Sequence, residues 1–130
     1  MEPSGYVERP DYRVDVLHRR NLVTVTVGDR QLARTESALI VDEQDHGIVF
    51  YIPEADVDFS NLTPVDHTTR CPYKGNASYW RLADGEKPIA WTYREPYPEV
   101  ALIVGHVAFY QDQVSVEVGV ATPAVVGYSK

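Results

Sequence analysis

The sequence contains very little cysteine and histidine. There is one cysteine, Cys71, and the four histidines are scattered along 130 residues. A single cysteine cannot form a disulfide within the chain, and it cannot supply a four-thiolate zinc site. We therefore expect no metal and no other cofactor, and a domain that is stabilised by the packing of its apolar side chains.

The sequence also lacks a long apolar run and an excess of positive charge. No apolar stretch approaches the roughly 18 residues that cross a bilayer, and residues 1–9 have no apolar core of a secretory signal. We therefore expect a soluble cytoplasmic protein with no membrane partner. Because 19 acidic residues face 12 basic ones, the formal charge is −7, and nucleic acid is a poor partner for such a surface.

The usual fingerprints of nucleotide and hydrolytic chemistry are missing too. There is no glycine-rich dinucleotide loop, no Walker loop, no His-Glu-x-x-His and no Gly-x-Ser-x-Gly. Asp56 and Asp58 have the spacing of two carboxylates that hold metal ions in nucleotidyl transfer, so metal-assisted nucleotide chemistry is one hypothesis. The alternative is a solvated acidic turn, since no phosphate-binding loop precedes these residues.

What the sequence has in abundance is short runs of Val, Ile, Thr and Tyr, separated by turn residues. This pattern is typical of a mainly β, antiparallel two-sheet domain, and the length fits a single domain. We expect strands at 22–27, 38–41, 47–52, 78–82, 89–93, 106–110 and 114–118, the last two forming a hairpin. Two short helical pieces are expected at 53–59 and 98–104, the second with Val100, Ile103 and Val104 on one stripe.

The two ends of the chain contain Pro and Gly and predict arms that lie on the body of the domain. The predicted organisation is an N-terminal arm at 1–12, a β domain at 13–118 and a C-terminal arm at 119–130. Val125, Val126 and Tyr128 are the expected docking points of the second arm.

Residues 66–80 form the densest unusual segment, with a thiol, a lysine, a histidine and three aromatic rings. Pro72 and Gly75 predict a turn between two strands, with Tyr73 and Lys74 projecting from its tip. A well-packed surface turn explains this composition as well as a binding site does. Loops on a rigid sheet are, however, also where binding groups concentrate.

Strand alternation predicts a second group of rings beside this turn. Trp80 shares a face with Ser78 and Leu82, and Trp91 shares a face with Tyr93 on the next strand, so the two tryptophans are expected as cross-strand neighbours. Such rings form either a core cluster or a cage for a flat or cationic ligand. His106 and Tyr110 would lie on one face of their strand with the small Ala108 between them, which leaves room for a ligand.

Cys71 is a candidate nucleophile if a nearby base or cation activates its thiol. His67 lies too far along an extended strand, so His106 and Lys74 are the better partners. The simpler interpretation is a buried, unreactive cysteine.

Five blocks of the sequence carry a resemblance to a known family. They are residues 51–57, 68–80, 90–93, 105–110 and 122–127, of which Cys71-Pro72-Tyr73-Lys74-Gly75 and Ala108-Phe109-Tyr110 are the most specific. Over nearly its whole length the chain resembles the bacterial domain-of-unknown-function 427 family, which sometimes carries a nucleotidyltransferase-type label.

The resemblance implies a β-tent fold, in which two antiparallel sheets lean together, as in methionine sulfoxide reductases and the ligand-binding domain of cereblon. Relatives of that fold often carry paired Cys-x-x-Cys zinc knuckles, which this sequence lacks. In cereblon-like members an aromatic cage holds a small ring, and Trp80, Trp91 and Tyr93 are the counterparts by analogy. In the reductases a cysteine attacks the sulfoxide, and here only Cys71 could correspond to it.

The leading hypothesis from the sequence is a small-molecule-binding module with an aromatic-lined polar pocket. The residues expected to bind the ligand are Cys71, Tyr73, Lys74, Trp80, Trp91, Tyr93, His106 and Tyr110. If the protein is an enzyme, Cys71, His106 and Lys74 are the catalytic candidates. Metal-assisted nucleotide chemistry and a structural or partner-binding role stay open as alternatives, and so does the oligomeric state.

Overall fold

A computed structural model describes residues 2–121, and the regular secondary structure of this part of the chain consists of strands and short 3-10 turns. The elements in chain order are η1 (Gly5–Val7), β1 (Val14–His18), β2 (Asn21–Val27), β3 (Arg30–Thr35), β4 (Leu39–Glu43), β5 (Ile48–Pro53), η2 (Glu54–Asp56), η3 (Phe59–Asn61), β6 (Leu62–Cys71), β7 (Gly75–Leu82), β8 (Pro88–Tyr93), η4 (Pro98–Ile103), β9 (His106–Phe109) and β10 (Ser115–Ala121).

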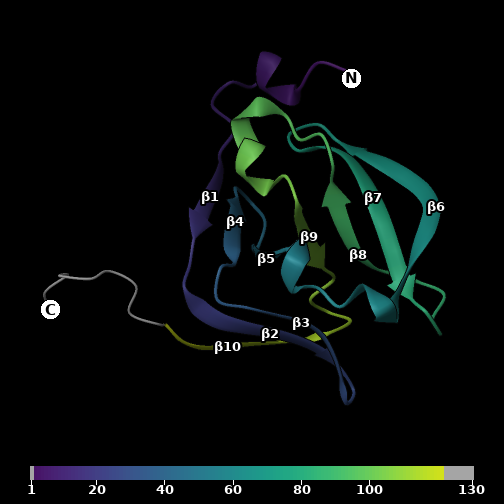
Figure 1. Cartoon of the computed structure of the whole chain (residues 1–130). Helices are drawn as coiled ribbons and strands as arrows, with labels where there is room; N and C mark the ends of the chain where they lie inside the picture. The colour runs from purple at the N-terminus through teal and green to yellow at the C-terminus, as the bar shows by residue number, and fades with distance from the viewer. Residues whose placement is uncertain (1, 122–130) are drawn as a thin grey trace, which may run out of the picture.

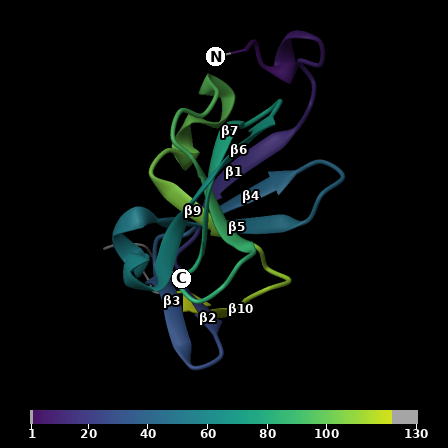
Figure 2. The same cartoon turned by 90° about the vertical axis from the view of Figure 1, so that its right-hand side faces the viewer.

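The strands form two antiparallel sheets. The large sheet has seven strands in the order β1-β4-β5-β9-β8-β7-β6, and the small sheet has three in the order β10-β2-β3. Figures 1 and 2 show the small sheet lying across the lower end of the large one. The mainly β, two-sheet fold predicted from the sequence is confirmed, and its short helices are 3-10 turns.

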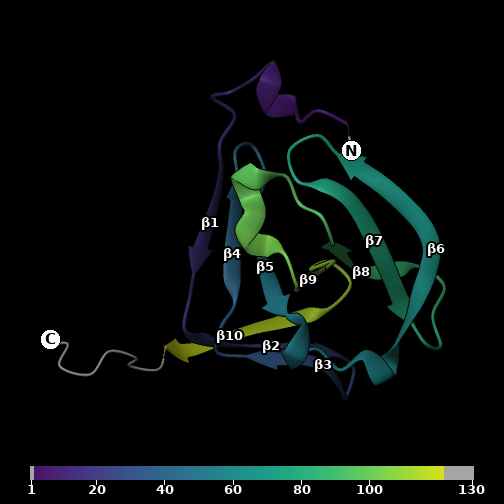
Figure 3. The same cartoon turned by 45° about the horizontal axis from the view of Figure 1, so that its top comes forward.

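The large sheet curls so that its two ends face each other. In Figure 3, β1 and β4 stand on one side and β7 and β6 on the other, with η4 between them. The face turned toward η4 is called the inner face here. The core on this face joins apolar residues from both ends of the curled sheet to two residues of η4. Its buried members are Leu39, Val41, Tyr51, Ala77, Tyr93, Val100, Ile103 and Ala108.

The opposite, outer face of the large sheet packs against the small sheet. Because side chains alternate along a strand, the residues next to the inner-face positions point to this second core. Its buried members include Val23 and Val25 of the small sheet and Ile52, Trp80, Ala90, Val107 and Phe109 of the large one. The alternation predicted for residues 22–27 is therefore confirmed at Val23 and Val25.

The hairpin predicted from 106–110 and 114–118 is wrong. β9 pairs with β5 and β8, whereas β10 pairs with β2 in the other sheet. Gln111 anchors the chain to β5, because its side chain accepts a hydrogen bond from the Phe50 N–H and donates one to the Ile48 carbonyl. Val114 and Val116 then pack against the outer core, which draws the chain across to the small sheet.

The two predicted helical pieces are present as 3-10 turns with a different exposure pattern. Val100 and Ile103 are buried as expected, but Val104 is half exposed. The backbone of η4 is kinked at Val100, and Val104 follows its last turn in a non-helical conformation, so no single helical stripe extends to position 104. None of the helices in the described range 2–121 is long and apolar enough to cross a membrane.

The segment before β1 lies along the end of the large sheet that carries the β6–β7 turn. The Gly5 N–H donates to the Pro72 carbonyl at 2.7 Å, Arg70 donates to the Pro3 carbonyl, and the Tyr97 hydroxyl donates to the Glu2 carbonyl. At the other end β10 continues to Ala121. The predicted docking points Val125, Val126 and Tyr128 lie outside the described residues.

Candidate functional site

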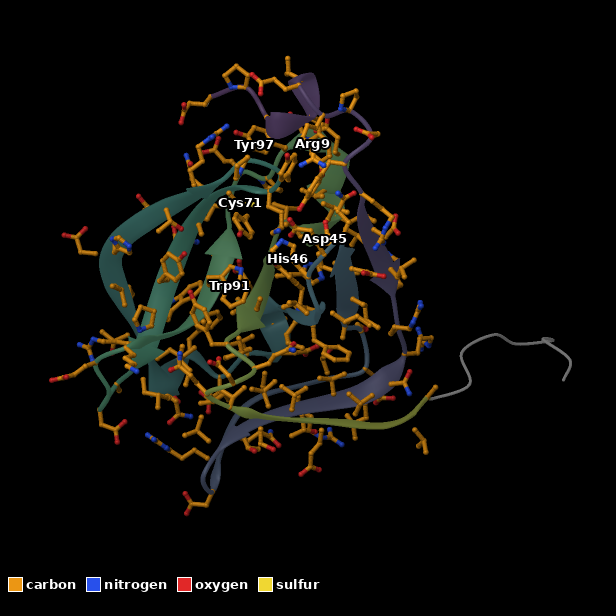
Figure 4. The ribbon with its side chains drawn as sticks, turned by 180° about the vertical axis from the view of Figure 1, so that it is seen from behind. Arg9, Asp45, His46, Cys71, Trp91 and Tyr97 are labelled. Carbon is orange, nitrogen blue, oxygen red and sulfur yellow. The ribbon has the colours of Figure 1, made fainter. Side chains whose placement is uncertain are left out.

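A cavity of about 430 Å³ opens on the inner face, beside the turn between β6 and β7. Figure 4 shows Cys71, His46 and Trp91 around this region, although they come from three separate segments. The lining residues are Tyr12, Val41, Glu43, His46, Gly47, Val49, Tyr51, Cys71, Pro72, Tyr73, Lys74, Trp91 and Tyr93. Five of the eight residues expected to bind a ligand are in this set, namely Cys71, Tyr73, Lys74, Trp91 and Tyr93.

The β6–β7 turn forms one wall of the cavity, at the position predicted from Pro72 and Gly75. Cys71 pairs with Gly75 across the turn. Gly75 has a φ of 123°, and a Cβ at this position would lie 3.1 Å from the Glu95 carbonyl oxygen. Only glycine combines this backbone conformation with such a close approach. The turn is therefore held tightly against the segment that follows β8.

Lys74 does not project from the tip of this turn as predicted, because it folds back into the protein and is only 8% exposed. Its ammonium forms an ion pair with Glu43 at the end of β4. Tyr12 donates a hydrogen bond to the same carboxylate, and His46 Nε2 lies 3.6 Å from it. Burying a charge is costly unless it is paired, and Glu43 supplies the pairing that keeps Lys74 inside.

The hydrogen bonds at Glu43 shift the pKa of Glu43 itself and of Tyr12. Burial alone would raise the pKa of Glu43, but the hydrogen bonds from Lys74 and Tyr12 outweigh it, so the pKa lies below its ordinary value. Burial and the hydrogen bond to Glu43 raise the pKa of Tyr12. At neutral pH Glu43 is therefore a carboxylate and Tyr12 a neutral phenol.

Tyr73 also turns back onto the protein, where it lies between two rings of the N-terminal segment. It stacks on Tyr12 with ring centroids 3.7 Å apart and meets Tyr6 edge-on at 5.2 Å. Gly5 makes this packing possible, because a Cβ at that position would lie 2.7 Å from the Tyr73 ring. The N-terminal segment thus completes the cavity wall and brings Tyr12 to Glu43.

Tyr51 and Trp91 form another part of the cavity wall and meet over the middle of the sheet. Both lie opposite Ala108 in the register of β9, one from each side. The Trp91 indole N–H donates to the Tyr51 hydroxyl at 3.2 Å, and the two rings are perpendicular. Ala108 is fully buried, so its small side chain gives room to these two rings and not directly to a ligand.

Tyr93 places a free hydroxyl on the cavity wall. Its side chain is 6% exposed, and its hydroxyl makes no hydrogen bond within the described residues. No buried side-chain nitrogen or oxygen in this part of the chain lacks a partner, so the Tyr93 hydroxyl must reach the cavity. Burial, with the nearby phenol of Tyr51, raises its pKa and keeps it neutral.

The prediction that Trp80 and Trp91 are cross-strand neighbours is wrong. In the observed register Tyr79 lies opposite Trp91, and Trp80 lies opposite Ala90. The two indoles therefore occupy opposite faces of the large sheet. Trp80 belongs to the outer core, where it packs on Phe59, while Trp91 belongs to the inner face. The irregularity that shifts this register lies between Trp80 and Arg81, near the loop that joins β7 to β8.

His106 and Tyr110 lie beside the cavity without lining it. His106 uses Nδ1 to bond the Val104 carbonyl at 2.9 Å, and the Tyr110 ring packs against Trp91. Cys71 lines the cavity, but Lys74, one of its two proposed partners, is engaged by Glu43. The arrangement therefore supports Cys71 as part of a binding wall more directly than as half of a catalytic pair.

Asp56 and Asp58 do not act together in the structure. Asp56 accepts a hydrogen bond from the Thr35 hydroxyl at 2.7 Å, whereas Asp58 caps η3 through the Ser60 N–H at 3.1 Å. Residues 2–121 contain no group of three or more side chains that could hold a metal ion. Both carboxylates thus have local structural roles on the surface.

Sequence reasoning missed Glu43, Tyr12, Tyr51 and His46 as members of the site. Glu43 had one usable signal, because it continues the alternation of Leu39 and Val41 and therefore belongs to the buried face of β4. Tyr12 had none, because its place depends on the packing of the N-terminal segment.

The fold and the cavity together define a mainly β, two-sheet domain with an aromatic-walled cavity on the inner face of its larger sheet. The chain belongs to the family described as domain of unknown function DUF427, which it matches over residues 15–120. No curated protein is similar enough to this chain to be matched with significance.

Proposed function

We propose that this protein is a small-molecule-binding module whose site is the inner-face cavity. The observation that carries the proposal is the combination of aromatic walls with the buried Lys74–Glu43 pair and the free Tyr93 hydroxyl. Ligand pockets commonly have this composition, with a few polar groups placed in a mostly apolar lining, and volumes of about 300–1,000 Å³.

The rigidity of the cavity walls supports this reading. Gly75 fixes the turn that carries Lys74, and the Trp91–Tyr51 hydrogen bond fixes two rings against each other. Groups that are already held in place lose little entropy when a ligand binds. A protein that only needed a stable core would gain more by filling such a cavity than by lining it with an ion pair.

A thermal-shift screen of metabolites tests the proposal with three proteins, namely the wild type, Tyr93→Phe and Tyr79→Phe. Tyr93→Phe removes the hydroxyl that faces the cavity. Tyr79→Phe removes a hydroxyl of the same kind that bonds Thr69 and does not line the cavity. A ligand at 100 times its dissociation constant stabilises the folded state by about 2.7 kcal/mol.

The proposal expects compounds that raise the melting temperature of the wild type and of Tyr79→Phe but raise that of Tyr93→Phe less. A broad screen without any shift would count against the proposal. Shifts that are equal in all three proteins would place the binding elsewhere.

A thiol enzyme at the same cavity is the second candidate, and the observation that favours it is the place of Cys71 in the wall. The two candidates separate in a Cys71→Ser variant assayed with any compound found in the screen. If binding survives the substitution and the wild type does not change the compound chemically, the result supports the binding module. Turnover that the substitution abolishes would establish the enzyme.

A further inference from the structure

The polar groups of the cavity define the chemistry of its ligand, and this inference rests on the proposed function. A bound molecule must replace the water that these groups lose, because a buried polar group without a partner costs free energy. The hydrogen-bond donors of the cavity that have no protein partner therefore call for acceptors on the ligand, and its free acceptors call for donors.

The buried acceptors of the cavity each have a hydrogen-bond partner already. One oxygen of Glu43 bonds Lys74 and the other accepts from Tyr12. The Tyr51 oxygen accepts from the Trp91 indole. The other side-chain acceptors on the wall belong to the hydroxyls of Tyr73 and Tyr93, which can equally donate, and to His46, which is largely exposed at the rim.

Several donors, in contrast, are free. An ammonium has three N–H groups, and within the described residues Glu43 is the only partner of the Lys74 side chain. The Tyr93 hydroxyl has no partner there, and the proton of the Tyr51 hydroxyl has no acceptor in residues 2–121. The cavity therefore offers a surplus of donors, which suits a ligand with carbonyl oxygens.

The net charge of the wall points to a neutral molecule. Lys74 and Glu43 lie side by side and cancel each other, so neither is left to pair with a charged ligand. A carboxylate would meet the negative charge of Glu43, and an ammonium would meet the positive charge of Lys74. Either would lose its hydration without gaining an unpaired opposite charge.

We infer that the site binds an uncharged, planar molecule with carbonyl acceptors, such as an aromatic or cyclic amide. Its flat body would lie against the rings of Tyr51 and Trp91. The Tyr12 ring, which stacks on Tyr73 and has the Arg9 guanidinium 5.1 Å from its centroid, would contribute only its edge. The carbonyl oxygen of the ligand would accept hydrogen bonds from Tyr93 and Lys74. Aromatic rings favour such stacked or edge-on contacts with a planar partner.

The test compares three probes of similar size on the full-length protein: benzamide, which is neutral, benzoate, which is anionic, and benzylamine, which is cationic. Trp80→Phe leaves Trp91 as the only indole, so its fluorescence reports binding at the cavity. Trp91→Phe leaves only Trp80 on the other face and is the matched control. Titrations at neutral pH give the three dissociation constants.

The inference expects benzamide to bind at least about tenfold more tightly than either charged probe, with a signal in the Trp80→Phe protein only. It also expects Tyr93→Phe to weaken benzamide about fivefold, which corresponds to one hydrogen bond. Benzoate or benzylamine binding as tightly as benzamide would overturn the ligand class while leaving the binding module in place. If none of the probes binds at the cavity at millimolar concentration, the ligand class fails, and the metabolite screen then decides the proposed function on its own.

Discussion

The Lys74–Glu43 pair gives a quantitative prediction about the stability of the site. Both side chains are nearly buried, with 11% and 12% of their surface exposed. Glu43→Gln keeps the shape of the side chain but removes the charge that neutralises Lys74. The ammonium is then left with little exposure to water and without an opposite charge beside it.

Removing one partner of a fully buried ion pair costs about 3–5 kcal/mol. Because this pair borders an open cavity, we expect about 2 kcal/mol for Glu43→Gln. Lys74→Met should cost about 1–2 kcal/mol, since Tyr12 still donates to the remaining carboxylate. The double variant leaves no unpaired charge, so it should be about 1–2 kcal/mol more stable than the sum of the two single changes predicts.

Chemical denaturation at neutral pH measures these differences as shifts of the midpoint at a constant slope. The reasoning is refuted if each single variant unfolds within about 0.5 kcal/mol of the wild type, as an exposed salt bridge would allow. It is also refuted if the two costs simply add. Tyr79→Phe is the control for a change on the inner face that leaves the pair intact.

Three further predictions concern the rings, the N-terminal segment and the response to pH. Trp80→Ala should destabilise the protein by about 3–5 kcal/mol in denaturation, because it empties part of the outer core. Trp91→Ala should cost less, because the Trp91 ring already borders a cavity. Equal costs would contradict the assignment of the two rings to opposite faces. Gly5→Ala should push the N-terminal segment away, because the new Cβ would lie 2.7 Å from the Tyr73 ring. Limited proteolysis should then cleave within residues 2–12 faster, while the midpoint of global unfolding stays nearly the same. An unchanged cleavage rate would speak against the contact. The lowered pKa of Glu43 contributes stability that is complete above the ordinary pKa of 4.5 and is lost on acidification. The raised pKa of Tyr93 contributes stability that is present below the ordinary pKa of 10.0 and is lost as the pH rises. Glu43→Gln should accordingly flatten the acid side of the stability profile, and Tyr93→Phe the alkaline side, and a variant profile parallel to that of the wild type would show the group to be uninvolved.

Local patterns in the sequence were enough to predict most strands, but not how every strand is paired. The alternation of Val23 and Val25 identifies a strand with one buried face, and the Pro72–Gly75 turn follows from its residues alone. The pairing of β10 could not be found this way. It depends on Gln111, which binds β5 through backbone groups distant in the sequence, and a hairpin is the simplest choice without that contact.

The candidate site was predicted in part, for a related reason. Residues near one turn, such as Cys71 and Lys74, could be grouped because they are close in the sequence. Trp80 was assigned to the wrong face, because shifting a pairing by one residue moves a side chain to the other side of a sheet. Tyr12 reaches the cavity from an irregular segment, for which no periodicity exists to be read.

The two indole N–H groups provide the most direct measurement of the central claim, which is that a small molecule binds on the inner face. A two-dimensional ¹H–¹⁵N NMR spectrum contains one indole signal from Trp91 at the cavity and one from Trp80 in the outer core. On titration with benzamide, or with any compound found in the metabolite screen, the account predicts that the Trp91 signal moves and that the Trp80 signal stays in place. Movement of the Trp80 signal alone, or of neither signal under saturating conditions, would contradict it.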